Sequence, residues 1–270
     1  MSLVLRYGSA ALGILWRDAE VFLSYRFRFA SQIASTLFTL LLLYYVSRLV
    51  RVDIFPSPDD YFAFATVGLV IFGVLTSILG AAPAALRQEL VAGTFERFVV
   101  SPFGAVAGVL SMLLFPFAYA LLNGVVSLLL AKLLFGLSLE WPSAALAVPA
   151  ALLGMAAFVP FAVLIASAVV LVKQAMTASS FLVAGIAVVA GLYFPVALLP
   201  GWIEWASDVQ PFTPAVDLLR HLLVGSPLEA SAWAEVAKLA LFAAALIPTS
   251  VWLLHRAVRL SRRRATILEY

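Results

Sequence analysis

Four ionisable side chains gather in a short stretch between two long apolar runs. Arg87, Glu89, Glu96 and Arg97 lie within the sequence RQELVAGTFERFVVSP, which ends at Pro102. Two carboxylates can act as a general acid and a general base, but the stretch offers no nucleophile and no set of metal ligands. We therefore expect neither a catalytic nor a metal site. The stretch is either a knob that docks into another protein or a solvated charged loop.

Gly93 is expected to interrupt any helix in the middle of this stretch. The sequence TFERFVV after it predicts a short helix that begins near Thr94 and carries Glu96 in its first turn. A carboxylate in that position interacts favourably with the helix dipole. The aromatic residues of this helix would face apolar surface, while Glu96 and Arg97 would reach outward.

The rest of the chain offers few reactive groups. It contains no cysteine, so disulfides, thiol nucleophiles and thiolate metal ligands are excluded. Its two histidines, His221 and His255, are far apart in the sequence and have no neighbouring ligand residues. We expect these histidines at a membrane interface or at helix ends.

The elements that position these groups are predicted to be membrane helices. Of the 270 residues, 64% are hydrophobic and only 11% are charged, and the mean hydropathy is +1.08. A soluble domain carries about 25% charged residues. Several apolar runs exceed the ~20 residues that a helix needs to cross a bilayer, and they lack the alternation of membrane β-strands. The composition predicts an all-α polytopic membrane protein.

Six transmembrane helices are predicted within residues 29–256: Phe29–Val50, Tyr61–Ala82, Ala105–Phe135, Ala144–Val172, Ser179–Leu199 and Ala232–Arg256. The third and fourth are longer than a perpendicular helix requires, so we expect them to tilt or to extend beyond the hydrocarbon. Pro116 and Pro160 can kink them. The main connections are then a segment 83–104 on one side and a segment 200–231 on the other.

Basic residues are distributed unequally between the two sides of these spans. Twelve would lie on one side: Arg6, Arg17, Arg26, Arg28, Arg87, Arg97, Lys173, Arg256, Arg259, Arg262, Arg263 and Arg264. Five would lie on the other: Arg48, Arg51, Lys132, Arg220 and Lys238. The richer side is expected to be cytoplasmic, together with both termini, the segment 83–104 and a basic tail at 257–270. This distribution explains the basic pI without a nucleic-acid partner.

Residues 1–28 are predicted to contain a cytoplasmic amphipathic helix. Apolar residues share one helical face and polar residues another: Leu12, Trp16, Ala19 and Leu23 against Arg17, Glu20, Ser24 and Arg28. Such a helix can lie in the membrane interface, although a helix packed on protein can show the same pattern.

The segment before the last span, YFPVALLPGWIEWASDVQPFTPAVDLLRHLLVG, is too apolar for a free external loop. Trp202 and Trp205 within it are typical interfacial anchors. Four prolines divide it: Pro195, Pro200, Pro211 and Pro214. We expect short external helices that re-enter the membrane and bury their ends in protein.

Two motifs resemble those of the membrane subunits of ABC type-2 exporters. The first is that family's Gly-Thr-Leu-Glu…Ser-Pro motif, with Phe95 in the usual place of leucine; its matching residues are Gly93, Thr94, Glu96, Ser101 and Pro102. The second precedes the last span, at Phe194, Pro195, Leu199, Pro200, Pro211, Pro214 and Arg220. With the six spans and the amphipathic start, the resemblance covers nearly the whole chain.

The resemblance implies a permease subunit in a prokaryotic plasma membrane, moving an amphipathic drug or lipid-like substrate out of the cytoplasm or inner leaflet. Two copies, or one copy with a close paralogue, would form the pathway. Each would dock on a separate ATPase subunit, present in two copies, that binds ATP and magnesium. The chain has no G-x-x-x-x-G-K-[ST] phosphate loop, so it would hold no cofactor and would not itself be an enzyme.

The resemblance also assigns residues to roles. Contact with the ATPase would involve the segment 83–104 through Glu89, Gly93, Thr94, Glu96, Arg97, Ser101 and Pro102. The external re-entrant segment would use Phe194, Pro195, Pro200, Trp202, Pro211, Pro214 and Arg220. Export of a lipid-linked polysaccharide is the alternative within the family, and an intramembrane lipid-modifying enzyme is a distant one. Secondary transport is disfavoured because no carboxylate lies well inside a span.

Three uncharged polar residues lie in or near the spans: Gln32, Asn123 and Gln174. They either form hydrogen bonds between helices or contact the substrate. The first two spans also carry aromatic residues that either line an apolar pathway or face lipid: Phe38, Tyr44, Tyr45, Phe64 and Phe72.

Overall fold

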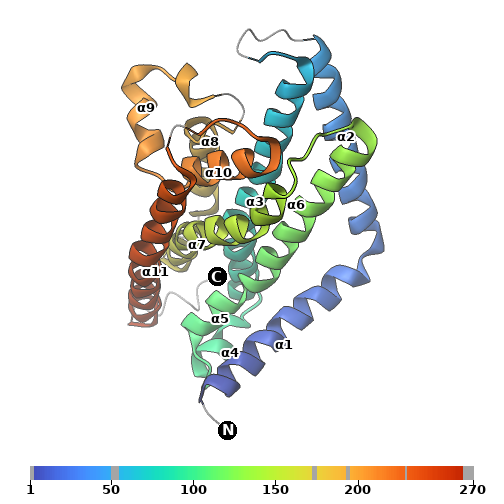
Figure 1. Ribbon diagram of the computed structural model, residues 1–270. Helices are drawn as coiled ribbons and strands as arrows, with labels where there is room; N and C mark the ends of the chain where they lie inside the picture. The colour runs from blue at the N-terminus through green and yellow to red at the C-terminus, as the bar shows by residue number, and fades with distance from the viewer. Residues whose placement is uncertain (1–2, 50–54, 172–174, 193–194, 229, 264–270) are drawn as a thin grey trace.

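The computed structural model describes residues 3–49, 55–171, 175–192, 195–228 and 230–263, and these ranges are helical with short connections and no strands, as predicted. The helices are α1 (Leu3–Ser24), α2 (Arg26–Leu49), α3 (Pro58–Val91), α4 (Phe95–Val100), α5 (Ala105–Ser111), α6 (Leu114–Phe135), α7 (Ala147–Leu171), α8 (Ala175–Val189), α9 (Gly201–Asp208), α10 (Phe212–Val224) and α11 (Ala232–Arg263), with 3-10 turns η1 (Ser143–Leu146) and η2 (Val196–Leu198). Figure 1 shows α1, α4 and α5 at one end of the long helices and α9 at the other.

Within the described ranges, five helical segments are long and apolar enough to cross a membrane: Phe29–Leu49, Pro58–Val91, Ala105–Phe135, Ser143–Leu171 and Ala232–Arg263. They correspond to the predicted spans one to four and six, so the chain is a multi-pass membrane protein. In place of the fifth predicted span stand the 15-residue α8 and the turn η2. Alone, α8 is about 22 Å long against a hydrocarbon core of about 30 Å. The count of six spans stays a prediction.

The helix α3 extends further than the sequence pattern predicts. The predicted second span stops before Pro83, but α3 continues through this residue to Val91. Pro83 cannot donate a backbone hydrogen bond to Leu79, yet membrane helices tolerate proline where neighbouring groups compensate. Arg87 and Glu89 therefore lie on the last turns of a long helix rather than in a loop.

The third predicted span is divided close to Pro116. A turn at Met112 and Leu113 separates α5 from α6. Pro116 has no N–H group for the carbonyl of Met112, four residues earlier, and its ring is crowded against that carbonyl. The kink predicted at Pro116 is present, whereas α7 is continuous through Pro160.

The core lies around α7, which contacts α3, α8, α10 and α11. The helix α2 contacts α3 and α6, and much of its apolar surface is exposed, including Phe38 and Tyr45. Tyr44 instead packs against Phe62 and Phe135, with ring centroids 5.6 and 5.4 Å apart. The predicted aromatic set therefore divides between the protein interior and the outer surface.

The first helix combines both alternatives that the sequence leaves open. Phe22 of α1 packs against Phe115 and Tyr119 of α6, with ring centroids 5.6 and 4.9 Å apart. Leu12, Trp16 and Leu23 are exposed. The helix thus rests on protein by one face and leaves most of its predicted apolar face uncovered. Its position in a membrane interface stays a prediction.

Candidate functional site

The polar stretch is built on the C-terminus of α3. The backbone of Gly93 has φ 68°, a left-handed conformation that glycine adopts without steric cost. Its amide donates to the carbonyl of Leu90 at 3.1 Å, and the amide of Thr94 donates to the carbonyl of Glu89 at 3.0 Å. These two bonds form a Schellman motif. The break predicted at Gly93 is therefore confirmed and has a defined geometry.

Thr94 connects α4 to α3. The helix α4 begins directly after it, as predicted, but the hydroxyl makes no capping bond to α4. It donates instead to the carboxylate of Glu89 and lies 3.3 Å from the carbonyl oxygen of the same residue. Thr94, which the sequence pattern assigns to the start of α4, thus fixes α4 to the end of α3.

Glu89 also forms an ion pair with Arg17 of α1. Arg17 Nη1 lies 3.2 Å from Glu89 Oε1, and Arg17 Nη2 lies 2.9 Å from Asp18 Oδ1. Partial burial lowers the pKa of Arg17, but the hydrogen bonds and charges of Asp18 and Glu89 raise it more, so Arg17 stays protonated. Half-exposed pairs contribute about 0–1 kcal/mol. The pair thus fixes the register of α1 against α3 more than it adds stability.

The helix α4 buries an aromatic residue and presents charges outward. Phe95 is 1% exposed, whereas Glu96 and Arg97 are exposed. Phe98 packs on α5 at Gly108, where an added Cβ would lie 2.6 Å from the Phe98 ring. This is the shape predicted for a docking knob: a short helix held by apolar side chains, with an acid and a base on its free side.

The Ser-Pro end of the motif forms the turn from α4 into α5. The hydroxyl of Ser101 donates to the carbonyl of Phe98 at 3.1 Å and accepts from the amide of Gly104 at 3.3 Å. Gly104 has φ 84°, and Pro102 is exposed. The turn returns the chain to the apolar segment that starts with α5.

A pocket of about 580 Å³ lies between α1, the end of α3, α4 and the start of α6. Arg17, Glu89, Thr94 and Arg97 supply most of its charged and polar lining, opposite aromatic side chains of α1, α4 and α6. The structure thus brings three of the predicted contact residues together with Arg17, which sequence reasoning missed. Nothing in the sequence pairs Arg17 with Glu89, because the two residues are far apart along the chain.

The second predicted set divides between an exposed and a buried helix. The helix α9 begins after Pro200 and exposes Trp202, which is 76% exposed. The helix α10 begins after Pro211 and is largely buried. At its start Phe212 lies 4.5 Å from Phe158 of α7, measured between ring centroids. The predicted short helices exist, and their re-entry into the membrane stays a prediction.

The remaining members of this set are Pro214, Pro195 and Phe194. Pro214 is buried within α10, and Pro195 precedes the turn η2. Phe194 lies outside the described residues.

Arg220, which the distribution of basic residues assigns to the external side, is buried in the protein. Its side of the membrane stays a prediction. It donates to the carbonyls of Gly191 at 2.8 Å and Leu192 at 2.9 Å, and more weakly to that of Phe64 at 3.4 Å. Its Cζ lies 3.5 Å from the centroid of the Phe64 ring. Gly191 and Leu192 follow the C-terminus of α8, where a helix carries partial negative charge. The cation therefore joins α10, α3 and the end of α8.

Gly68 of α3 provides the space for this contact and is the second residue that sequence reasoning missed. An added Cβ would lie 2.0 Å from the carbonyl oxygen of Leu192 and 2.7 Å from Nη2 of Arg220. A small residue inside a span is typical of close helix packing, but the sequence does not indicate which residues pack against Gly68.

The predicted polar pathway residues do not converge. Gln32 on α2 and Asn123 on α6 are half-buried, and neither lines the pocket just described or the apolar pocket between α3, α6, α7 and α10. Gln174 lies outside the described residues. A role in substrate contact stays a prediction for all three.

A sequence model described as ABC-2 type transporter matches residues 11–224. The match includes the Gly-Thr…Ser-Pro stretch with α4 and also α9 and α10. No curated protein matched the chain.

Proposed function

Because the chain belongs to the ABC-2 type transporter family, we propose that it is the membrane-spanning permease subunit of an exporter that uses ATP hydrolysed by a separate protein. The ABC-2 membrane domain is a transport component rather than a catalytic ATPase, and it generally works with an ABC ATPase subunit.

The observation that carries the proposal is the construction of α4. Its buried Phe95 fixes it to the protein, and its exposed Glu96 and Arg97 are free of ion pairs within the described ranges. A helix of this kind can enter a groove on a partner and offers both signs of charge for recognition. We assign docking of the ATPase to this surface.

The contacts of α4 also provide a route for the movement of the ATPase. Thr94 joins α4 to the end of α3 through Glu89, and Phe98 joins it to α5 at Gly108. Glu89 in turn holds Arg17 of α1. A displacement of α4 on closure of two ATPase subunits would therefore reach α1, α3 and α5 together, as in a rigid-body transition of packed elements.

The distribution of basic residues supports a cytoplasmic position for α4. The helix α4, which carries Arg97, lies at the same end of the molecule as the last turns of α11, which carry Arg259, Arg262 and Arg263 (Figure 1). The positive-inside rule places such an end in the cytoplasm. Both termini would then be cytoplasmic, in the plasma membrane of a prokaryote.

The assembly would contain two permease subunits and two ATPase subunits. The exposed apolar surface of α2 supports contact with a second copy or a close paralogue, and ATP and magnesium would bind in the ATPase. The substrate would be an amphipathic drug or a lipid-like molecule, because the described parts of the spans are strongly apolar and carry few charged side chains. It would leave the cytoplasm or the inner leaflet through the interface of the two permease subunits.

Charge reversal at Glu96 tests the proposal. Glu96→Lys removes an acidic contact and adds repulsion within a basic or hydrogen-bonding groove, which costs about 2–5 kcal/mol at a buried charged contact. We expect membrane abundance to be normal and copurification of the ATPase to fall by more than about tenfold, since ~1.4 kcal/mol corresponds to a factor of ten.

Glu204→Lys is the matched control. Glu204 is also an exposed acidic residue in the first turn of a short helix, but it lies in α9 at the opposite end of the molecule. The control should leave ATPase copurification unchanged. Equal copurification of the ATPase with both variants and the parent chain would contradict the proposed docking surface.

A further inference from the structure

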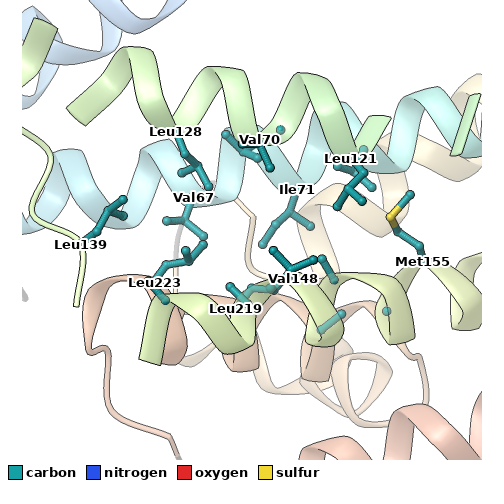
Figure 2. A pocket seen from close by; sticks show the side chains of 18 of the residues that line it. Val67, Val70, Ile71, Leu121, Leu128, Leu139, Val148, Met155, Leu219 and Leu223 are labelled. Carbon is teal, nitrogen blue, oxygen red and sulfur yellow. The ribbon is translucent and has the colours of Figure 1, made fainter. Parts of the chain in front are cut away.

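A second pocket lies within the membrane-spanning region and is lined by apolar side chains. Its volume is about 400 Å³, within the range of about 300–1,000 Å³ typical of ligand sites. Figure 2 shows side chains converging on it from four elements, including Leu128 of α6, Ile71 of α3, Met155 of α7 and Leu219 of α10. The deepest of these are almost fully buried: Ile71 and Met155.

The pocket opens between α6 and α7. Its exposed lining residues all come from these two helices and their connection: Val125, Leu129, Trp141, Ala145 and Val148. Because α6 and α7 belong to two of the five segments that can cross the membrane, the opening lies at the side of the molecule and at the depth of the hydrocarbon. A ligand would reach it from the bilayer.

The pocket and the stretch of α6 between it and Lys132 together match the thickness of one leaflet. Its inner limit on α6 is Leu121, and the outer end is marked by Trp141 in the connection to α7. The stretch of α6 from Leu121 to Lys132 is about 16 Å long at the helical rise, and half of the hydrocarbon core is about 15 Å thick. An acyl chain that starts at the membrane surface would therefore end near Leu121.

A cation stands at the outer end of the pocket. Lys132 Nζ lies 5.7 Å from the centroid of the Trp141 ring, and it forms no ion pair with a carboxylate in the part of the chain that the structure describes. Tryptophan and lysine are typical of the headgroup level, where lysine can extend toward lipid phosphates. The charge is complementary to the phosphate of a phospholipid.

We propose that this pocket binds one acyl chain of a phospholipid from the leaflet that contains the end of α6, with the lipid phosphate held by Lys132. The lipid is a resident of the bilayer rather than the transported substrate. The assignment depends on the membrane location of the chain and is independent of how the permease receives energy from ATP.

An acyl chain explains the pocket better than water or a void does. An almost wholly apolar wall offers too few hydrogen-bond partners to hold ordered water, which needs about two to four of them. An empty space would leave the lining side chains without dispersion contacts on one side. Within the bilayer, the methylene groups of a lipid acyl chain can supply these dispersion contacts.

Photo-crosslinking tests the assignment. The full chain is reconstituted in phosphatidylcholine vesicles that contain phosphatidylglycerol with a diazirine at the end of one acyl chain, and labelled residues are mapped by mass spectrometry. We expect labels on Ile71 and Met155, which lipid at the outer surface cannot reach. Labels confined to exposed side chains, with none on Ile71 or Met155, would overturn the proposal.

Two matched substitutions on α7 separate the pocket from the general surface. Val148 lines the mouth and is 45% exposed, whereas Leu152 is 41% exposed on the same helix and does not line the pocket. Val148→Trp should lower labelling of Met155 by about tenfold, the effect of losing roughly two buried methylene contacts. Leu152→Trp should leave it unchanged. Leu129→Trp fills the mouth from α6 and repeats the test if Val148→Trp is poorly folded.

The role of Lys132 has its own readout. In competition with phosphatidylglycerol lacking the diazirine, Lys132→Gln should weaken lipid retention severalfold, and Lys132→Arg should preserve it because the positive charge remains. Equal retention in all three proteins would contradict the headgroup contact. Loss of labelling in the Val148 variant with normal ATPase copurification would support the lipid site even if the proposed docking role of α4 were wrong.

Discussion

Replacing Gly68 by alanine should destabilise the protein, although alanine is the better helix former. The added Cβ would lie 2.0 Å from the carbonyl oxygen of Leu192 and 2.7 Å from Nη2 of Arg220. Leu192 contributes backbone, which cannot rotate away, so α3 and the end of α8 would have to separate by more than about 1 Å to reach normal contact distances.

The magnitude follows from the two shortest hydrogen bonds of Arg220. They measure 2.8 and 2.9 Å, so a separation of this size would break or greatly weaken both. A hydrogen bond to a charged group contributes about 1.5–3 kcal/mol, which gives a loss of about 3–6 kcal/mol. The helix preference of alanine returns at most about 1 kcal/mol. A net destabilisation of about 2–5 kcal/mol is therefore expected.

Gly73→Ala is the control in the same helix. An added Cβ at Gly73 meets no atom within 4 Å, so this variant should be neutral or up to about 1 kcal/mol more stable. Pulse proteolysis of the purified protein in detergent over a denaturant series measures both differences. Hydrogen exchange of the backbone amides at 186–192 should rise in Gly68→Ala alone. A Gly68→Ala protein as stable as Gly73→Ala would refute the close packing of Arg220, Leu192 and α3.

Three further predictions concern α4, the topology and the assembly. Thr94→Val keeps the shape of the side chain but removes the hydrogen bond to Glu89. Hydrogen exchange of the backbone amides at 95–100 should therefore increase by about five- to tenfold, the effect of ~1 kcal/mol. Thr94→Ser should keep the parent value, and an unchanged exchange rate in Thr94→Val would show that this bond does not hold α4. A single cysteine at the exposed position Val100 should react with an impermeant reagent only after the cells are permeabilised, whereas one at the exposed position Val209 should react in intact cells. The reverse pattern would invert the topology. Native mass spectrometry of gently solubilised membranes should find two copies of a permease subunit with two copies of an ATPase, whereas a transport-competent particle without ATPase would contradict the proposal.

The sequence predicts the helical class and most spans because long apolar runs have few other solutions in a membrane. It also predicts the break at Gly93, since a glycine between two helical patterns marks a left-handed C-cap. The length of α3 could not be predicted in the same way. A proline usually ends or kinks a helix in soluble proteins, but Pro83 is tolerated in a packed membrane helix.

Long-range contacts account for what the sequence does not reveal about the candidate site. The pairing of Arg17 with Glu89 and the burial of Arg220 both depend on segments that meet only in the folded protein. A basic residue in a predicted external segment is ordinarily solvated, and the carbonyls of Gly191, Leu192 and Phe64 make the buried position of Arg220 favourable. The apolar pocket is likewise invisible in the sequence, because the same aliphatic residues fill any helix interface.

The most direct test of the central proposal is a photo-crosslink from α4 itself. A photoreactive amino acid is placed at Glu96 in one version of the chain and at Trp202 of α9 in the other, both exposed positions at opposite ends of the molecule. After irradiation of intact cells, crosslinked partners are identified by mass spectrometry. The proposed function predicts a crosslink from position 96 to a protein with a G-x-x-x-x-G-K-[ST] phosphate loop and none from position 202. An ATPase crosslink from position 202, or its absence from position 96 at equal expression, would contradict the assignment of α4 as the docking surface.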